Sequence, residues 1–195
     1  MNKLVIASNN PGKLREFKHM LAPLGIEVIT QAQLGISEAE EPHCTFIENA
    51  LAKARHVSRA SGLPALADDS GICVDALGGA PGVLSARYAG EPKSDRRNNE
   101  KLLKTMQDVT DRRAHYYCVL VTVRHADDPQ PMIAEGEWRG EIAHEERGDG
   151  GFGYDPMFWL PELGKMSSEL THDEKAQFSH RAKALNILLQ RLRSA

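Results

Sequence analysis

Short apolar runs and amphipathic stretches alternate along the chain, a pattern typical of an α/β fold. Near the N-terminus, the apolar run Leu-Val-Ile-Ala at residues 4–7 predicts a strand, and residues 27–30 predict a second one. Between them, apolar residues recur every three or four positions from Leu14 to Leu24, as on one face of a helix. The turn-forming residues 8–13 connect the first strand to this helix.

A second helix is predicted to begin after Thr45, because Thr45 and Glu48 have the spacing of a capping box. Gly62 marks its expected end. Helical spacing places one set of apolar residues on its buried side: Phe46, Ile47, Ala50, Leu51, Ala54 and Val57.

Two short strands, at residues 65–67 and 72–74, are predicted on either side of the polar sequence Asp-Asp-Ser-Gly at residues 68–71. In this interpretation the two aspartates lie at the end of a strand. Residues 95–106 predict a further helix.

The second half of the chain continues the alternation. Residues 116–124 and 132–138 are rich in β-branched and apolar residues, and the turn signal at 127–129 predicts that they form an antiparallel hairpin. The sheet is therefore expected to be mixed. Thr171 and Glu174 form another capping box. The last segment predicts an amphipathic packing helix, with apolar positions Ala184, Leu185, Leu188, Leu189 and Leu192.

Composition restricts the class of protein. The chain has 195 residues, of which 41% are hydrophobic and 26% charged, so it can bury the core of a single domain spanning residues 1–195. The net charge is −3, and its signs are interspersed. Affinity for nucleic acid or for an anionic membrane is therefore not expected.

The expected location is the cytoplasm, because the first apolar run is far too short for a signal-peptide core or a membrane span. The cysteines Cys44, Cys73 and Cys118 are odd in number and widely spaced, which favours reduced thiols over disulfides. Cys73 and Cys118 are expected in the core. A structural zinc site is not expected, since paired Cys or His spacings are lacking.

The loop at residues 8–13, Ser-Asn-Asn-Pro-Gly-Lys, is a candidate phosphate-binding element. The first turn of the following helix offers unsatisfied N–H donors and a positive dipole end, and Lys13 adds a full charge. The loop is not a P-loop, because that motif has an earlier glycine and a Ser or Thr where this chain has Leu14. An ordinary connection between a strand and a helix has the same features, so the loop alone does not settle the function.

Acidic residues suggest a cation site. Consecutive carboxylates at Asp68 and Asp69 repel one another and are costly at a half-buried strand end unless a cation accompanies them. Mg²⁺ needs only one or two protein carboxylates in addition to water and substrate phosphates. A turn at Gly71 is the alternative explanation for the aspartates. Glu38 and Glu40 are interpreted as solvated surface charges, since acidic residues are mostly exposed.

Asn49 and Lys53 lie one turn apart on the second predicted helix, so both can project toward the same spot. A lysine there could neutralise phosphate oxygens, although a solvent-facing lysine is the more common situation.

Residues 148–156 combine several glycines with Phe152 and Tyr154, which permits close backbone approach to a flat ligand and stacking on an aromatic ring. A plain glycine-rich hairpin loop is the alternative. Lys175 and His180 follow at the starts of the last two predicted helices.

Together these motifs resemble the inosine/xanthosine triphosphate pyrophosphatases, a family that removes deaminated purines from the nucleotide pool. The likeness covers nearly the whole chain. Its motifs occur in the family's order at residues 8–13, 45–50, 67–71, 79–82, 85–88, 151–156 and 179–181. The chain departs from the family's usual Thr-Gly at Ser8 and Asn9, which keeps a hydroxyl but removes a glycine.

The resemblance implies a mixed central sheet flanked by helices, with two lobes and an active-site cleft between them. It also implies hydrolysis of dITP, ITP, dXTP or XTP to the nucleoside monophosphate and pyrophosphate. Mg²⁺ is the implied cofactor, and a homodimer the implied assembly.

Site residues are implied in the same way. Asp69 resembles the general base and a metal-site carboxylate, with Asp68 and either Glu41 or Glu40 supporting the cation. Phosphate or sugar contacts are implied for Ser8, Asn9, Asn10, Pro11, Gly12, Lys13, Lys53 and Ser70. Residues implied around the base are Phe152, Gly153, Tyr154, Asp155, Lys175, His180 and Arg181.

Base selectivity is expected to depend on hydrogen-bond donors. Hypoxanthine carries a 6-oxo group where adenine carries a 6-amino group, so an N–H from His180 or Arg181 would favour hypoxanthine. Guanine shares the 6-oxo group, and the sequence does not indicate how it is refused.

Two other functions fit parts of the sequence. The Maf-type pyrophosphatases have a related fold, but usually begin with Ser-x-Ser-Pro-Arg-Arg, which differs from residues 8–13 here. A nucleotide-sensing module without turnover would use the same pocket, and the fold alone does not distinguish it from an enzyme. Lys13, Asp68 and Asp69 favour the enzyme.

Overall fold

The computed structural model describes residues 2–194, which form two compact units. The first unit comprises residues 2–69, 118–135 and 184–194, and the second comprises residues 70–117 and 136–183. Strands β3, β4 and β5 each contribute residues to both units. The two units correspond to the two expected lobes.

The strands are β1 (Lys3–Ile6), β2 (Glu27–Thr30), β3 (Ala65–Val74), β4 (Arg113–Val123), β5 (Met132–Ile142), β6 (Phe158–Leu160) and β7 (Lys165–Met166). The α-helices are α1 (Pro11–Leu21), α2 (Phe46–Ser61), α3 (Asp95–Thr105), α4 (His172–Phe178) and α5 (His180–Ser194). Short 3₁₀ helices cover Ala22–Leu24, Ala32–Leu34, Asp75–Leu77, Gly82–Arg87, Asp155–Met157 and Ser167–Glu169.

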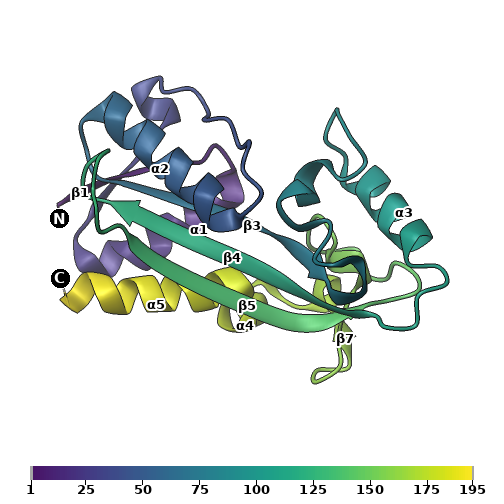
Figure 1. The fold of residues 1–195 in the computed structure, drawn as a ribbon. Coiled ribbons are helices and arrows are strands. Elements are labelled where there is room, and N and C mark those ends of the chain that lie inside the picture. Colours follow the sequence, from purple (N-terminus) through teal and green to yellow (C-terminus); the bar gives the residue numbers. More distant parts are fainter. Residues whose placement is uncertain (1, 195) are drawn as a thin grey trace. The chain divides into compact units, whose positions relative to one another are not determined.

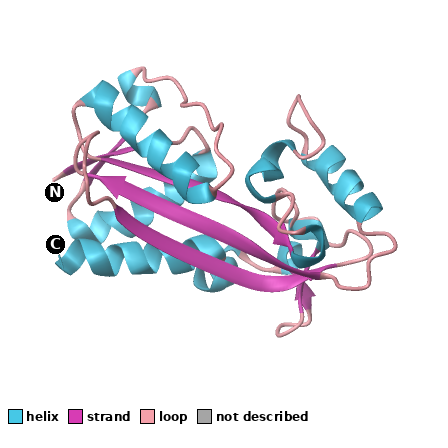
Figure 2. Cartoon of the chain, in the orientation of Figure 1, coloured by secondary structure: helices cyan, strands magenta, loops and turns pink. Residues whose placement is uncertain are grey.

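The strands form one sheet in the order β2-β1-β3-β4-β5-β6-β7, with helices packed against it (Figure 2). Strand β1 pairs in parallel with β2 and β3, whereas β6 pairs antiparallel with β5 and β7. The predicted mixed sheet is therefore confirmed. Strands β4 and β5 are neighbours joined by residues 124–131, as the predicted hairpin requires.

In the first unit, α1 and α5 pack against the sheet through one apolar cluster, and α2 lies on the opposite side of β1 (Figure 1). The cluster includes Leu4 and Ile6 of β1, Phe17 of α1, and Leu185 and Leu188 of α5. The apolar spacing of the C-terminal helix thus predicted its packing correctly.

Helix α2 begins as predicted, because the Thr45 hydroxyl accepts a hydrogen bond from the Glu48 backbone N–H, and Gly62 ends it with a φ of 69°. Of its predicted buried residues, Ala50, Ala54 and Val57 are buried, Phe46 and Leu51 are half-buried, and only Ile47 is exposed. Ile47 is 37% exposed, whereas Asn49 and Ser58 are buried. The polar side chains are buried because both hydrogen-bond to neighbouring backbone groups.

The most consequential difference from prediction concerns β3, which is one continuous strand of ten residues rather than two short ones. Asp68 and Asp69 therefore lie inside the strand, where both are buried, and not at its end. The strand continues through the carboxylates because lysines of the first unit pair with them, as described below. Among the cysteines, Cys118 is buried as predicted, but Cys73 is only half-buried and Cys44 is exposed.

Candidate functional site

The first unit places the loop after β1 beside the two aspartates. Strand β1 pairs in register with β3 as far as Ile6 and Leu66, and the Ala7 N–H donates to the Leu66 carbonyl at 2.8 Å. Beyond this point β1 gives way to the loop at residues 8–13, while β3 continues into Asp68 and Asp69. The parallel pairing thus determines that the loop and the carboxylates are neighbours.

The backbone N–H groups at the start of α1 were expected to be unsatisfied and available to a phosphate, but they are bound within the loop. Asn10 caps α1, and its side-chain oxygen accepts hydrogen bonds from the N–H groups of Gly12 and Lys13 at 2.9 and 3.1 Å. The Asn10 N–H in turn donates to the Ser8 hydroxyl at 3.2 Å. The donors expected to be unsatisfied are therefore occupied within the loop, because asparagine is a strong helix cap. Asn9 donates instead to Glu38, at 2.9 Å.

Lys13, in the first turn of α1, carries the charge that the loop offers. Its Nζ lies 2.7 Å from Oδ2 of Asp68, whose side chain is only 2% exposed. Pairing with a cation offsets the cost of burying this carboxylate inside a strand.

Lys53 of α2 is the second cation of the first unit and contacts two carboxylates. Its Nζ forms an ion pair with Glu41 and lies 3.5 Å from Oδ1 of Asp69. The side chains of Lys53 and Asp69 are 14% and 12% exposed. Lys53 is therefore a partner of buried charges and not a solvent-facing lysine.

Burial and neighbouring charges change the titration of this cluster. Burial raises the pKa of Asp69 above its usual value, Lys53 opposes this effect, and Glu41 and Asp68 add to it. Burial lowers the pKa of Lys53, but the carboxylates of Asp69, Asp68 and Glu41 more than offset this, so the net shift is upward. Lys53 is consequently a firmly protonated cation beside a carboxylate of increased basicity.

Among the glutamates before α2, the structure brings Glu41 to Lys53 and leaves Glu40 exposed. Asn49 was expected to project toward the same spot as Lys53. Its side chain instead binds the backbone of the segment that precedes α2. Its side chain accepts from the His43 N–H at 3.0 Å and donates to the His43 carbonyl at 3.2 Å. This clamp fixes the segment that carries Glu41.

In the second unit, Asp155 connects several predicted base-side residues. One carboxylate oxygen accepts hydrogen bonds from the Ser167 hydroxyl at 2.9 Å and the Tyr116 hydroxyl at 3.3 Å. The other accepts from the Phe152 N–H at 2.9 Å and pairs with Lys175 of α4. Because both oxygens are occupied and Asp155 is buried, it orients its neighbours rather than offering a free acceptor.

The glycine-rich loop presents one of its two aromatic rings. Phe152 is 61% exposed, and Lys175 Nζ lies 4.9 Å from the centroid of its ring. Tyr154, expected to be available for stacking, is buried, and its hydroxyl donates to the Ser85 carbonyl at 2.8 Å. Gly151 has a φ of 78°, and a Cβ at this position would collide with the Asp155 side chain, so only glycine fits this turn.

His180 and Arg181 begin α5, and both are buried. The His180 ring stacks on Tyr116 with a centroid distance of 4.9 Å and an interplanar angle of 10°. Arg181 Nη2 lies 3.5 Å from the Ser70 hydroxyl. Ser70 directly follows Asp69 in β3. The residue that Arg181 contacts is therefore the next residue along the chain from a carboxylate of the first unit's cluster.

The sequence-predicted site thus separates into two groups. The first unit brings together Lys13, Lys53, Glu41, Asp68 and Asp69. The second unit brings together the base-side residues around Asp155 and Tyr116. The predicted cleft that would combine the two groups stays a prediction.

Comparison with known proteins decides the family. The Ham1 family model matches residues 4–191. The chain belongs to the Ham1 family. A relative from Nitrosomonas europaea, named dITP/XTP pyrophosphatase, is 67% identical to this Ham1 chain over 192 residues, covering 98% of the chain and 95% of the relative. One from Pectobacterium atrosepticum with the same name is 55% identical over 197 residues, with full coverage of both.

Solved structures agree with this assignment. A HAM1 protein from Coxiella burnetii superimposes on the Ham1 chain with a TM-score of 0.97 at 44% identity, covering 100% of both chains. The Ham1 protein of Staphylococcus aureus gives a TM-score of 0.91 at 42% identity, covering 99% of both.

Some residues that shape the site in this Ham1 chain were not found from the sequence. Tyr116 and Ser167 contact Asp155, and Tyr116 also supports His180. Two residues of α3 hold Gly153 in place. Asp95 accepts a hydrogen bond from the Gly153 N–H at 2.8 Å, and the Asn99 side chain donates to the Gly153 carbonyl at 3.1 Å. Each lies in an ordinary strand or helix pattern, and only Asp95, as a polar residue at a helix start, carries a local signal.

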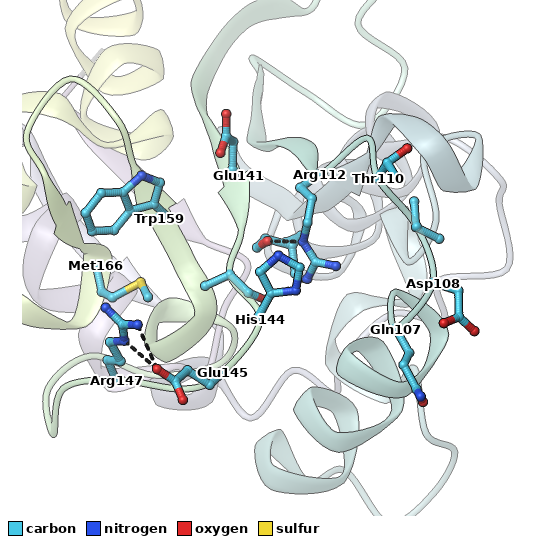
Figure 3. Close-up of a pocket in the computed structure, with 13 residues that line it drawn as sticks. Gln107, Asp108, Thr110, Arg112, Glu141, His144, Glu145, Arg147, Trp159 and Met166 are labelled. Atoms are coloured by element: carbon cyan, nitrogen blue, oxygen red, sulfur yellow. Dashed lines mark hydrogen bonds and ion pairs between the residues drawn. The ribbon is translucent and has the colours of Figure 1, made fainter.

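A cavity of about 680 Å³ in the second unit of the Ham1 chain contains none of the predicted site residues (Figure 3). Both arginines that line it are already engaged, and its remaining charged groups include Asp108 and Glu141. Arg112 donates to the backbone carbonyls of Met106, Ile142 and Ala143, and Arg147 pairs with Glu145. The cavity therefore offers no chemistry comparable to that of the lysine and carboxylate cluster.

Within residues 2–194, the Ham1 chain has no ready-made group of three or more His, Cys, Asp or Glu side chains arranged to hold a metal ion. None of its described helices is both long and apolar enough to cross a membrane.

Proposed function

We propose that this Ham1-family protein hydrolyses the deaminated purine nucleoside triphosphates dITP, ITP, dXTP and XTP to the monophosphate and pyrophosphate. The observation that carries this proposal is the cluster of the first unit, in which Lys13 and Lys53 pair with three carboxylates, one of them the buried Asp69. Full-length relatives named dITP/XTP pyrophosphatase, at 55–67% identity, support it.

The reaction assigns Asp69 the role of proton acceptor. Water attacks the α-phosphorus, the bond from this phosphorus to the α-β bridging oxygen breaks, and pyrophosphate leaves with the electron pair. The proton lost by the water passes to a carboxylate oxygen of Asp69. The upward shift of the Asp69 pKa supports this role, because a stronger base accepts the proton more readily.

The two lysines stabilise the charge that develops on the phosphates. In the free protein each lysine neutralises carboxylates, Lys13 on Asp68 and Lys53 on Glu41 and Asp69. An incoming triphosphate carries a larger total negative charge than a single carboxylate, and can therefore compete for these ammonium groups. The ion pairs therefore hold the lysines in place before the substrate arrives.

The donor set fits a divalent cation such as Mg²⁺. Asp69 and Glu41, which share Lys53, supply hard carboxylate oxygens, and Asp68 adjoins Asp69 in the strand. These side chains do not form a ready-made group of three ligands, but Mg²⁺ is commonly held by only one or two carboxylates, with the remaining positions filled by water and phosphate. When bound, the cation supplies neutralisation of phosphate charge and makes a nearby water more acidic. Glu40 is exposed and is not assigned to this group.

The residues of the second unit are proposed to recognise the base. Phe152 offers a stacking surface, and Lys175, His180 and Arg181 offer N–H donors toward the 6-oxo group that hypoxanthine and xanthine share. Asp155 holds Lys175 and the loop of Phe152 in place. The protein is further proposed to act in the cytoplasm as a homodimer.

The direct test is to incubate the purified protein with ITP and Mg²⁺ and to identify the phosphate product. Release of pyrophosphate and IMP in equal amounts is expected, with removal of divalent cations by EDTA abolishing turnover. Release of orthophosphate would overturn the proposed cleavage position, and no turnover of any purine triphosphate would favour a nucleotide-sensing module.

Replacing Arg181 with alanine is expected to lower the preference for ITP over ATP by about tenfold or more, because a donor facing the 6-oxo group is removed. The measurement is kcat/KM for ITP, XTP, GTP and ATP in both proteins. Arg193→Ala is the matched control, since Arg193 is an exposed arginine of the same helix. An unchanged ratio would remove Arg181 from base recognition.

A further inference from the structure

We propose that Tyr116 is a positioning residue for base recognition, through the stacking of its ring on His180. The inference rests on the proposed function and concerns a residue of β4 that none of the sequence motifs includes. Tyr116 is buried and therefore acts through its neighbours, without touching the nucleotide.

The Tyr116 ring is held firmly by other rings of the second unit. Phe158 meets it edge-on with a centroid distance of 4.7 Å, and Trp138 stacks on it at 6.5 Å. On this support the His180 ring lies nearly parallel, 4.9 Å away and tilted by 10°. Offset-stacked rings at this separation attract one another, so the orientation of His180 follows that of Tyr116.

The Tyr116 hydroxyl contacts Asp155, which holds other residues proposed to recognise the base. It donates to Asp155, whose other oxygen holds Lys175 and the Phe152 N–H. One residue thus contacts both His180 and the carboxylate that positions Lys175.

The two contacts of Tyr116 are unequal. The hydroxyl lies 3.3 Å from Asp155 Oδ1, and the same oxygen accepts a shorter bond, of 2.9 Å, from Ser167. Loss of the hydroxyl leaves that oxygen hydrogen-bonded. The stacked ring, in contrast, fixes the plane of His180, and an aliphatic side chain does not reproduce a flat stacking surface. The ring is therefore the part of Tyr116 that matters for function.

The test compares Tyr116→Leu with Tyr116→Phe, which keeps the ring and removes only the hydroxyl. In the leucine variant, KM for ITP is expected to rise about tenfold while kcat changes less than about threefold, because base positioning and not the chemical step is lost. The phenylalanine variant is expected to remain within about twofold of the natural protein in both constants.

Inhibition by pyrophosphate separates positioning from general damage. Pyrophosphate has no base and is proposed to bind Lys13 and Lys53 of the first unit, so its inhibition constant is expected to be unchanged in Tyr116→Leu. The inference is overturned if Tyr116→Leu loses affinity for ITP and for pyrophosphate equally, or if its KM for ITP equals that of the natural protein. Either result leaves the proposed function intact. Absence of ITP hydrolysis in the natural protein overturns both.

Should Tyr116→Leu fail to fold, NMR of the natural protein and of Tyr116→Phe gives the answer. Stacking on an aromatic ring is expected to shift the His180 ring protons upfield in both proteins, with assignment by His180→Gln. Unshifted His180 ring protons overturn the inference.

Discussion

Replacing Asp69 with asparagine is expected to lower kcat for ITP by about 10²–10⁴-fold, the usual contribution of a positioned general base. Asparagine has nearly the same shape, but its amide does not accept the proton from the attacking water. The affinity for nucleotide is expected to stay within a few fold, since Lys13 and Lys53 remain as phosphate partners. Steady-state pyrophosphate release gives kcat, and equilibrium titration with ITP gives the dissociation constant.

The control for this variant is Asp127→Asn, which makes the same chemical change at a carboxylate that is 88% exposed and pairs with Arg59. It is expected to leave both constants unchanged. Near-natural turnover in Asp69→Asn would exclude Asp69 as the proton acceptor, and the role would then have to pass to another group of the cluster.

Much of the fold could be predicted because its elements carry local signals. Apolar periodicity located α1, α2 and α5, and the capping residues Thr45 and Thr171 marked where two helices begin. These signals depend on residues close together in sequence. A single chain therefore displays them without knowledge of tertiary contacts.

Strand β3 shows where such local reasoning fails. Four consecutive polar and glycine residues look like a strand break, yet the strand continues because Lys13 and Lys53 neutralise Asp68 and Asp69 from other elements. The partner that makes a buried carboxylate tolerable lies 16 residues away or more, and hydropathy does not reveal it.

The candidate site was predictable to a similar degree. Motif residues such as Lys13, Lys53 and Asp69 were identified by type and order, and the structure groups them. The residues that hold the motifs in place were missed, as with Tyr116, because an aromatic residue in an apolar strand is typical of any core. Tyr154 shows the opposite error. It lies within a motif and was expected to be available for stacking on a ligand, but its side chain is buried beneath the loop.

The internal ion pairs of the cluster have a consequence for metal binding. In the free protein, Lys53 already supplies positive charge to Glu41 and Asp69. A divalent cation that binds alone is repelled by this ammonium group. A cation that arrives with a triphosphate brings phosphate oxygens, with which Lys53 can form an ion pair instead. We therefore expect the protein to bind Mg²⁺ weakly alone and more tightly together with nucleotide.

Lys53→Met is expected to change catalysis and metal binding in opposite directions. Without the ammonium group, kcat/KM for ITP is expected to fall about 10²–10³-fold, as for loss of one charge-stabilising donor in other enzymes. In the absence of nucleotide, however, the affinity for Mg²⁺ or Mn²⁺ is expected to rise about fivefold or more, since one unit charge at 4 Å contributes ~1 kcal/mol even in bulk water. Steady-state kinetics and metal titration followed by calorimetry or Mn²⁺ spin resonance measure the two effects.

Arg59→Met is the matched control, because it removes a positive charge from the same helix at a pair that is exposed on both sides. It is expected to change neither constant. If Lys53→Met weakens metal binding along with turnover, Lys53 serves only to hold the carboxylates in place. If metal binding strengthens while turnover falls, the same ammonium group neutralises the carboxylates in the free protein and the phosphates in the complex. Only this second result fits a site in which substrate and cation enter together.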